Sequence, residues 1–350
     1  HESLIATKAR RVRTVAPKDA LMEFGLRRAQ GHSAGLWGAR AAMIGGFNGT
    51  SNVEAGKRFG IPVLGTMAHS WVMSFDEEID AFREYVRQYH DNLILLADTY
   101  NVLEMGVPHA IQVFKELKEE GRLPGKYGIR IDSGDIAYLS QEATRMFTEA
   151  GFPDAIISGS NDLDEYTIQS LKAQGCTVTS WGVGTKIITA DGTSALGGVF
   201  KMAVKEADGK EVPVMKFSND VEKMTNPGIK TVYRFYKKDT GKMITDLVCL
   251  HDEKAADGGD FTLVTESAKW RRKELKAGTY TVEELLRPVI ENGRNLPLPV
   301  LPEIIRYANK QMDTLWPEYT RLLNPDLMEI NLSDKLQTLK SELIRRELGE

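Results

Sequence analysis

The chain has 350 residues, of which 42% are hydrophobic and 27% are charged, and its formal net charge is −4. This composition is typical of a globular enzyme, and the slightly acidic balance excludes a broad basic surface for nucleic acid. No apolar run is long enough to cross a membrane, and the two cysteines, Cys176 and Cys249, lack metal-site spacing. We therefore expect a cytoplasmic protein without a disulfide framework.

The first two hundred residues or so repeat one pattern, in which a short apolar run ends in polar or glycine-rich residues and a helical segment often follows. In segments 107–121 and 135–151 the apolar residues recur every three or four positions and a glycine ends the pattern. Continuously apolar strands that alternate with helices predict a parallel sheet buried on both faces, and about eight strands predict an irregular α/β barrel. The predicted strands are 21–24, 45–47, 61–64, 93–97, 127–131, 155–157, 178–181 and 198–204.

The pattern changes after residue 204. We expect two regions, an α/β barrel catalytic domain over residues 1–204 and a C-terminal α+β extension over residues 205–350. In the extension, alternating apolar residues and an Asp-Thr-Gly turn predict antiparallel strands, and amphipathic spacing predicts surface helices. The strand segments are 211–218 and 230–250, and the helical segments are 281–293, 301–323 and 333–348.

Polar residues gather where the predicted strands end, which is the edge that carries the chemistry in a parallel barrel. Each cluster alone is also typical of a turn or a helix cap, but seven clusters at corresponding positions favour a functional site. The clusters are FGLRR (24–28), FNGTSN (47–52), GTMAHS (65–70), ADTYN (97–101), RIDSGD (130–135), SGSND (158–162) and GVGT (182–185).

The clusters also indicate a ligand class. Small residues in the last two let backbone N–H groups approach a phosphate closely. An acidic group made of Asp98, Asp132 and Asp135 either binds ribose hydroxyls or holds Mg²⁺ on a diphosphate. Guanidinium groups for a carboxylate or phosphate come from Arg27, Arg28 and Arg130. The implied substrates are a phosphosugar and an acid.

These ordered motifs resemble the nicotinate phosphoribosyltransferase family, from SLIATKA (3–9) through every strand-end cluster to NPGIKTVYR (226–234). The resemblance implies the irregular α/β barrel of the type II phosphoribosyltransferases and a homodimer with shared active sites. The family has an additional N-terminal domain, and this chain starts at His1 without an initiator methionine, so we expect a fragment of a longer protein. Asn101 stands where relatives often have aspartate.

The resemblance further implies the reaction. Nicotinate and phosphoribosyl diphosphate would give nicotinate mononucleotide and diphosphate, the first step of NAD synthesis from nicotinate, with Mg²⁺ on the diphosphate and no direct protein ligand for it. His69 taken alone is more typical of a packing residue, but it matches the histidine that the family phosphorylates with ATP. Hydrolysis of this phosphohistidine is coupled to product formation.

Other site residues also follow from the resemblance. We expect Asp132 and Asp98 in the catalytic centre, with Asp132 on the ribose, and Ser51 donating a hydrogen bond to the nicotinate carboxylate unless it merely caps the next helix. The expected substrate-binding residues are Phe24 on the pyridine ring, Arg27, Ser51, Thr66, Arg130 on the carboxylate, Asp135, Ser160, Asn161, and Gly184 with Thr185 on the sugar phosphate.

Other functions remain as alternatives. Nicotinamide and quinolinate phosphoribosyltransferases share the fold. A barrel aldolase would need Lys186 or Lys201 as a Schiff-base lysine, and the sequence shows no apolar pocket around either. A non-catalytic fragment is disfavoured because every strand-end cluster is intact.

Overall fold

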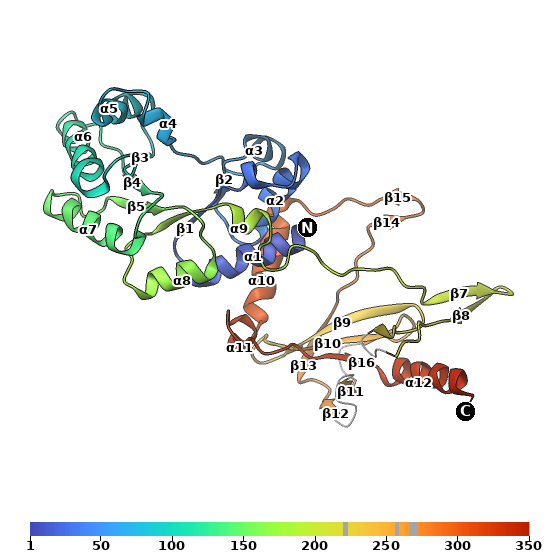
Figure 1. Ribbon diagram of the computed structural model, residues 1–350. Coiled ribbons are helices and arrows are strands. Elements are labelled where there is room, and N and C mark those ends of the chain that lie inside the picture. The colour runs from blue at the N-terminus through green and yellow to red at the C-terminus, as the bar shows by residue number, and fades with distance from the viewer. Residues whose placement is uncertain (220–222, 256–258, 266–271, 350) are drawn as a thin grey trace. The chain divides into compact units, whose positions relative to one another are not determined.

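The structure is a computed structural model that describes residues 1–219, 223–255, 259–265 and 272–349. The chain divides into two units (Figure 1). Unit 1 contains His1–Leu196 and Leu301–Ile305, and unit 2 contains Gly197–Val300 and Arg306–Glu350. The helix α10 (Leu301–Thr314) therefore starts in the first unit and ends in the second.

Unit 1 is built on a parallel sheet of six strands in the order β2-β1-β6-β5-β4-β3. Its strands are short apolar runs, and all four residues of β3 are buried, as expected where both faces of a sheet are covered. The strands are β1 (Ala20–Glu23), β2 (Gly49–Thr50), β3 (Leu93–Leu96), β4 (Tyr127–Ile131), β5 (Ile156–Gly159) and β6 (Ser180–Val183).

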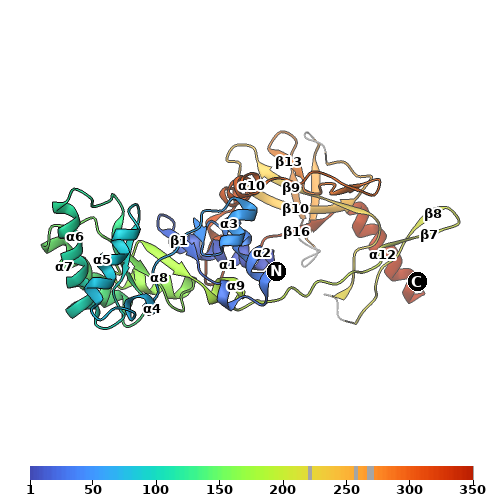
Figure 2. The same cartoon turned by 90° about the horizontal axis from the view of Figure 1, so that it is seen from above.

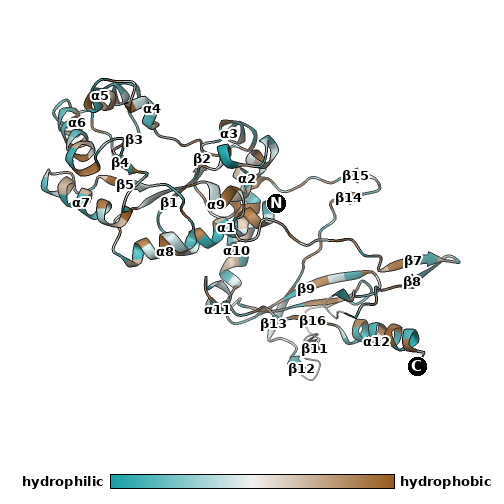
Figure 3. Cartoon of the chain, viewed as in Figure 1, coloured by the Kyte–Doolittle hydropathy of each residue, from teal (hydrophilic) through white to brown (hydrophobic). Residues whose placement is uncertain are grey.

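Helices surround this sheet. Figure 1 shows α5, α6 and α7 gathered beside β3 and β4, with α1, α2 and α3 beside β1 and β2. Figure 2 shows the same two groups of helices from above. Figure 3 shows both hydrophilic and hydrophobic residues on α5 and α7, and their apolar sides pack into one core that includes Phe82, Phe147 and Trp181. The helices are α1 (Glu2–Val15), the 3-10 turn η1 (Leu26–Arg28), α2 (His32–Ile44), α3 (Val53–Phe59), α4 (His69–Val72), α5 (Glu78–Gln88), the π-helical turn η2 (Val102–Gly106), α6 (Val107–Glu119), α7 (Ile136–Glu149), α8 (Glu165–Ala173) and α9 (Thr185–Ile188).

The predicted α/β fold class is confirmed, although the parallel sheet has six strands where about eight were expected. Segment 61–64 forms only a single bridge, from Thr50 to Val63, because Pro62 has no N–H to donate to a ladder. The short strand expected at 45–47 lies slightly later, at β2.

The strand expected at 198–204 is also absent from this sheet. Val204 instead begins β7 (Val204–Ala207), which pairs antiparallel with β8 (Lys210–Pro213). Phe200 is fully exposed, and glycines at 197 and 198 weaken the strand preference of this apolar run.

Unit 2 contains a second six-stranded sheet, in the order β12-β11-β16-β10-β9-β13. The hairpin predicted over 230–250 is confirmed, because β9 and β10 pair antiparallel. Helices within 301–323 and 333–348 are also confirmed, and Figure 3 shows hydrophilic and hydrophobic residues on α12. The elements are β9 (Lys230–Lys237), β10 (Met243–Leu250), β11 (Phe261–Thr265), β12 (Arg272–Leu275), β13 (Tyr280–Glu284), β14 (Ile290–Glu291), β15 (Arg294–Asn295), α11 (Pro317–Thr320), β16 (Ile330–Leu332) and α12 (Asp334–Leu348).

The helix expected over 281–293 is wrong. Its first residues form β13, in which Thr281 pairs with Tyr236 and Val282 with Phe235. The apolar spacing fits a helix, but the free edge of β9 offers backbone partners, and Pro288 interrupts a helix at this point. In the described ranges, the helices are too short or too polar for a membrane crossing.

A close backbone contact holds the end of β3. The π-helical turn η2 brings Gly106 against Ala97, the residue that follows the strand. A Cβ at Gly106 would lie 2.0 Å from the Ala97 carbonyl oxygen. Only glycine fits such a contact without a backbone shift, so Gly106 fixes the position of the residues after β3.

We predict that Gly106→Ala lowers the free energy of unfolding by about 1–3 kcal/mol, because the added methyl group overpacks the backbone at Ala97. Chemical denaturation of both proteins measures the change. Gly125→Ala is the matched control, since nothing lies within 4 Å of a Cβ there. Equal losses in the two variants would contradict the close contact.

Candidate active site

A pocket of about 380 Å³ opens at the C-terminal edge of the unit 1 sheet. Its lining residues lie at or just after the ends of β1, β4, β5 and β6, or at the short helices η1, α4 and α9, so the parallel strand direction brings them together. They are Phe24, Arg27, Arg28, Ala68, His69, Arg130, Asp132, Ser160, Asn161, Asp162, Gly182, Gly184 and Thr185.

His69 is a half-exposed member of the pocket and is the first residue of α4. Its Nδ1 is 3.1 Å from Thr99 Oγ1, which orients the ring. Its Nε2 is 3.9 Å from Asp98 Oδ1 and 3.7 Å from Asp132 Oδ2. The ring is therefore accessible to a ligand, with one nitrogen engaged and the other near two carboxylates, which is unlike a packed core histidine.

The two carboxylates differ in their surroundings. Asp98 is almost completely buried, and its Oδ2 accepts hydrogen bonds from the Asp132 backbone N–H at 3.0 Å and the Ser133 hydroxyl at 2.6 Å. Its Oδ1 has no hydrogen-bond partner among the described residues. Asp132 is partly exposed, and its Oδ1 accepts a hydrogen bond from the Ser160 hydroxyl. Asp98 thus holds the loop after β4, and Asp132 faces the pocket.

Arg130 is a largely buried cation in the same pocket. One Nη donates to the Thr66 hydroxyl, the other lies 4.0 Å from Asp132 Oδ2, and the Nε has no hydrogen-bond partner among the described residues. Burial lowers the pKa of Arg130, while Asp132 and Asp98 oppose that shift. A guanidinium stays protonated in such a place, so it attracts an anion that would satisfy its free N–H groups.

Glycine makes room for the aromatic residue of the site. A Cβ on Gly182 would lie 2.7 Å from a ring carbon of Phe24, so the ring packs directly over the β6 backbone. Asn161 has a φ of 119°, a rare conformation for a residue other than glycine, and its side chain accepts a hydrogen bond from the Asp162 N–H at 2.8 Å. Backbone strain of this kind is common at ligand sites.

The structure brings nine of the thirteen predicted site residues into the pocket lining. They are His69, Asp132, Phe24, Arg27, Arg130, Ser160, Asn161, Gly184 and Thr185. Asp98 and Thr66 are not lining residues but contact residues that are. Asp98 accepts a hydrogen bond from the Asp132 N–H and lies 3.9 Å from His69, and the Thr66 hydroxyl accepts one from Arg130. Ser51 and Asp135 are also outside the lining.

Ser51 and Asp135, the other two predicted residues outside the lining, differ in their local contacts. Asp135 caps α7 by accepting a hydrogen bond from the Tyr138 N–H at 3.0 Å. Ser51 does not cap α3, because Asn52 is the cap and accepts from the Ala55 N–H, so that alternative role for Ser51 is wrong. The expected contact of Ser51 with a carboxylate stays a prediction.

Three lining residues were not assigned a role from the sequence. Ala68, Asp162 and Gly182 line the pocket beside predicted members of the same clusters, and Arg28, expected as one of the guanidinium groups, also lines it. In the sequence, the only feature that could have identified these three is their position within those clusters. The fold is needed to show which residues of a cluster face the pocket. Lys186, one of the two lysines considered for the aldolase alternative, is paired with Asp191 at 2.9 Å, and this contact raises its pKa. A Schiff-base lysine needs a lowered pKa, so the structure disfavours Lys186 in that role.

A buried carboxyl group lies next to the pocket residue Phe24 in the chain. Glu23, the last residue of β1, is completely buried and accepts hydrogen bonds from the Gly25 N–H and from the Thr50 hydroxyl at 2.6 Å. Burial raises the pKa of Glu23, and the two hydrogen bonds partly oppose that shift. The group ties the turn after β1, which carries Phe24, to the neighbouring strand β2.

Comparison with known proteins gives consistent matches over most of the chain. Residues 20–254 match the Nicotinate phosphoribosyltransferase (NAPRTase) family, and residues 229–340 match the Nicotinate phosphoribosyltransferase C-terminal domain. A nicotinate phosphoribosyltransferase of Bacillus subtilis (strain 168) is 41% identical, with 98% of this chain and 69% of the relative covered. One from Homo sapiens is 31% identical, with 98% of this chain and 72% of the relative covered.

Solved structures agree with the sequence matches. The crystal structure of human nicotinic acid phosphoribosyltransferase aligns with a TM-score of 0.82 at 30% identity, over 98% of this chain and 74% of that chain. The nicotinate-nucleotide pyrophosphorylase of Pyrococcus furiosus aligns with a TM-score of 0.67 at 22% identity, over 89% of this chain and 70% of that chain. The second likeness concerns the fold alone.

We predict that Glu23→Gln reduces the pH dependence of stability. With a raised folded-state pKa, the wild-type free energy of unfolding is highest below the ordinary carboxyl pKa of about 4.3 and falls as the pH rises toward the folded value. The amide does not ionise and still bonds to Gly25 and Thr50, so the variant should gain stability relative to wild type across that interval.

Chemical denaturation at a series of pH values from roughly 4 to 8 measures this difference. Exposed Glu119→Gln is the matched control and should leave the pH profile parallel to wild type. A constant difference between wild type and Glu23→Gln at every pH would contradict the raised pKa.

Proposed function

Because the chain belongs to the nicotinate phosphoribosyltransferase family of transferases, we propose that it joins nicotinate to phosphoribosyl diphosphate. The products are nicotinate mononucleotide and diphosphate, in the first step of NAD synthesis from nicotinate. The main observation in favour of nicotinate as the substrate is the buried guanidinium of Arg130. Arg130 lines the pocket, and its Nε has no hydrogen-bond partner among the described residues.

Arg130 pairs with the nicotinate carboxylate in this proposal. Its fixed position comes from the Thr66 hydroxyl and the nearby Asp132 carboxylate. A planar guanidinium binds a carboxylate through two parallel hydrogen bonds, and burial strengthens them. A neutral nicotinamide would leave that buried charge without an anionic partner, so the site favours the acid over the amide.

The rest of the pocket receives the ring and the phosphosugar. Phe24 packs on the pyridine ring, since its own ring is held over Gly182 at the pocket wall. The sugar phosphate lies against Gly184 and Thr185, and Asp132 contacts the ribose hydroxyls. These contacts place the nicotinate nitrogen and the anomeric carbon within one confined volume, which lowers the entropic cost of their reaction.

The chemical step needs few protein groups. The lone pair of the ring nitrogen forms a bond to the anomeric carbon, and the bond from that carbon to diphosphate breaks with its electron pair leaving on oxygen. No proton has to be removed from the nucleophile, so no general base is required. Positive charge develops on the ribose ring, and the carboxylate of Asp132 stabilises it electrostatically.

The carboxylates also fit a magnesium ion on the diphosphate. Mg²⁺ commonly takes one or two protein carboxylates together with phosphate oxygens and waters. Asp132 faces the pocket, and the buried Asp98 has one oxygen with no hydrogen-bond partner among the described residues. When bound, the ion neutralises charge on the leaving diphosphate.

ATP is a third substrate in this proposed reaction, with His69 as the phosphorylated residue. Thr99 Oγ1 at 3.1 Å engages Nδ1, which leaves Nε2 as the nucleophilic nitrogen on the side of the pocket carboxylates. Its lone pair forms a bond to the γ-phosphorus and the bond to ADP breaks. Water later cleaves the phosphohistidine and releases phosphate. The added negative charge, about −1.5 to −2 at neutral pH, reorganises binding near Arg130.

Two further expectations belong to this proposal. The chain would act in the cytoplasm, which agrees with both cysteines being free thiols. It would also act as a homodimer with shared active sites, as the sequence resemblance implies. Size-exclusion chromatography with light scattering tests the dimer, and a purely monomeric active enzyme would contradict it.

Substrate turnover tests the function itself. Product formation is measured with nicotinate, nicotinamide and quinolinate, each with phosphoribosyl diphosphate and Mg²⁺, and with and without ATP. Preferred conversion of nicotinate supports the proposal. Preferred conversion of either other acceptor, or no conversion by a folded chain, overturns it.

We predict that Arg130→Lys raises the KM for nicotinate roughly tenfold or more, because an ammonium cannot form the two parallel hydrogen bonds of the guanidinium. The KM for phosphoribosyl diphosphate should change much less. Steady-state kinetics with each substrate varied in turn measure both. Exposed Arg122→Lys, on a surface pair with Glu120, is the matched control. Equal increases in both KM values would remove Arg130 from the carboxylate position.

We predict that His69→Ala abolishes ATP hydrolysis and the gain in nicotinate affinity that ATP gives, while slow ATP-independent transfer continues. The reason is that the alanine has no nitrogen to phosphorylate, whereas the ring and ribose contacts remain. Labelled ATP and product formation are followed together, with exposed His90→Ala as the control. Labelled phosphate on another residue, detected by mass spectrometry, would refute the role of His69.

A further inference from the structure

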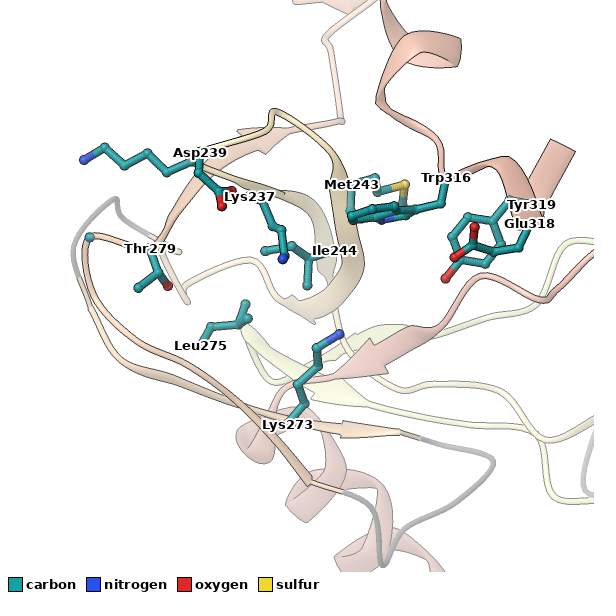
Figure 4. A pocket seen from close by; sticks show the side chains of 12 residues that line it. Lys237, Asp239, Met243, Ile244, Lys273, Leu275, Thr279, Trp316, Glu318 and Tyr319 are labelled. Atoms are coloured by element: carbon teal, nitrogen blue, oxygen red, sulfur yellow. The ribbon is translucent and has the colours of Figure 1, made fainter.

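Unit 2 has a pocket of its own, of about 640 Å³, within the size range of small-molecule sites (Figure 4). It is built from the turn between β9 and β10, the end of β12 with the turn that follows, and the segment around α11. It shares no lining residue with the candidate active site. Nothing in the proposed reaction uses it.

The pocket has an apolar floor and an aromatic wall. Met243 and Leu275 are buried and Ile244 is half-buried beside them. The indole N–H of Trp316 donates to the Met243 carbonyl oxygen at 2.7 Å, which fixes the orientation of the ring. Figure 4 shows the Trp316 ring beside Met243, with Tyr319 next to it. A flat apolar group would lose its contact with water here against a rigid surface.

Two cations face the same space. In Figure 4 the side chains of Lys237 and Lys273 extend into the pocket from opposite sides. Lys237 Nζ lies 5.8 Å from the centre of the Trp316 ring. Neither lysine forms an ion pair with a described residue, although the carboxylates of Asp239 and Glu318 are among the lining residues. An anion between the two ammonium groups would therefore gain charge-assisted hydrogen bonds without displacing an existing pair.

We propose that this pocket binds a nucleoside phosphate. The aromatic wall of Trp316 and Tyr319 accepts the base, and the phosphate lies between Lys237 and Lys273. Each half of the site recognises one half of such a ligand, because stacking needs a flat ring and the lysines need an anion. The site is separate from the proposed ATP reaction at His69.

Photolabelling of the full chain with 8-azidoadenosine diphosphate locates the site directly. Label is expected in the tryptic peptide of residues 311–321, which contains Trp316 and Tyr319. Excess adenosine diphosphate should prevent labelling, whereas adenosine or inorganic phosphate at the same concentration should protect much less. Label confined to unit 1 would overturn the proposal. Equal protection by inorganic phosphate would also overturn it, since the ring would then contribute nothing.

Variants separate this pocket from the active site. Lys237→Ala combined with Lys273→Ala should weaken protection by adenosine diphosphate roughly tenfold or more, because both charged contacts are lost. The double arginine variant should retain binding, and Lys205→Ala, an exposed lysine on β7, is the matched control. His69→Ala should leave labelling of the peptide unchanged. Unaltered protection in the double alanine variant, with the fold intact by circular dichroism, would overturn the proposal.

Discussion

The register of the parallel sheet in unit 1 is the constraint on which the site depends. Leu96 of β3 lies opposite Arg130 of β4, and Arg130 lies opposite Ser158 of β5. At the other end of the sheet, Glu23 of β1 lies opposite Val183 of β6. The ends of β1, β4, β5 and β6 therefore meet at one edge of the sheet, and residues at or just after these ends line one pocket. A slip of one residue in any strand would turn its side chains to the opposite face.

Within that pocket the charges stabilise one another. Arg130 is buried next to two carboxylates, and the deeper one, Asp98, accepts hydrogen bonds from the loop that carries Asp132. Burying these groups costs free energy unless each has a partner, and the free Nε of Arg130 and free Oδ1 of Asp98 show that the pairing is incomplete within the described residues. Substrate groups of opposite charge, or an ion, would complete it. The same incomplete pairing that weakens the fold would therefore favour the binding of such a ligand.

The two units differ in how far local sequence determined their elements. In unit 1, continuous apolar runs and terminal glycines located β3, β4, α6 and α7 well, because these strands are buried on both faces. In unit 2, residues 281–284 have helical apolar spacing but form β13, because the edge of β9 satisfies their backbone groups. Backbone pairing with a distant strand outweighed the local preference there.

The sequence by itself determined the α/β class, the strand-end clusters and most of the pocket lining, because each cluster directly follows an apolar run that must be buried. Only the tertiary structure decided which members of a cluster face a ligand. Asp132 faces the pocket whereas Asp135, three residues later, caps α7, since the loop turns between them. The tertiary structure likewise brought Lys237, Lys273 and Trp316 together, because strand pairing and helix packing join segments that are far apart in the chain.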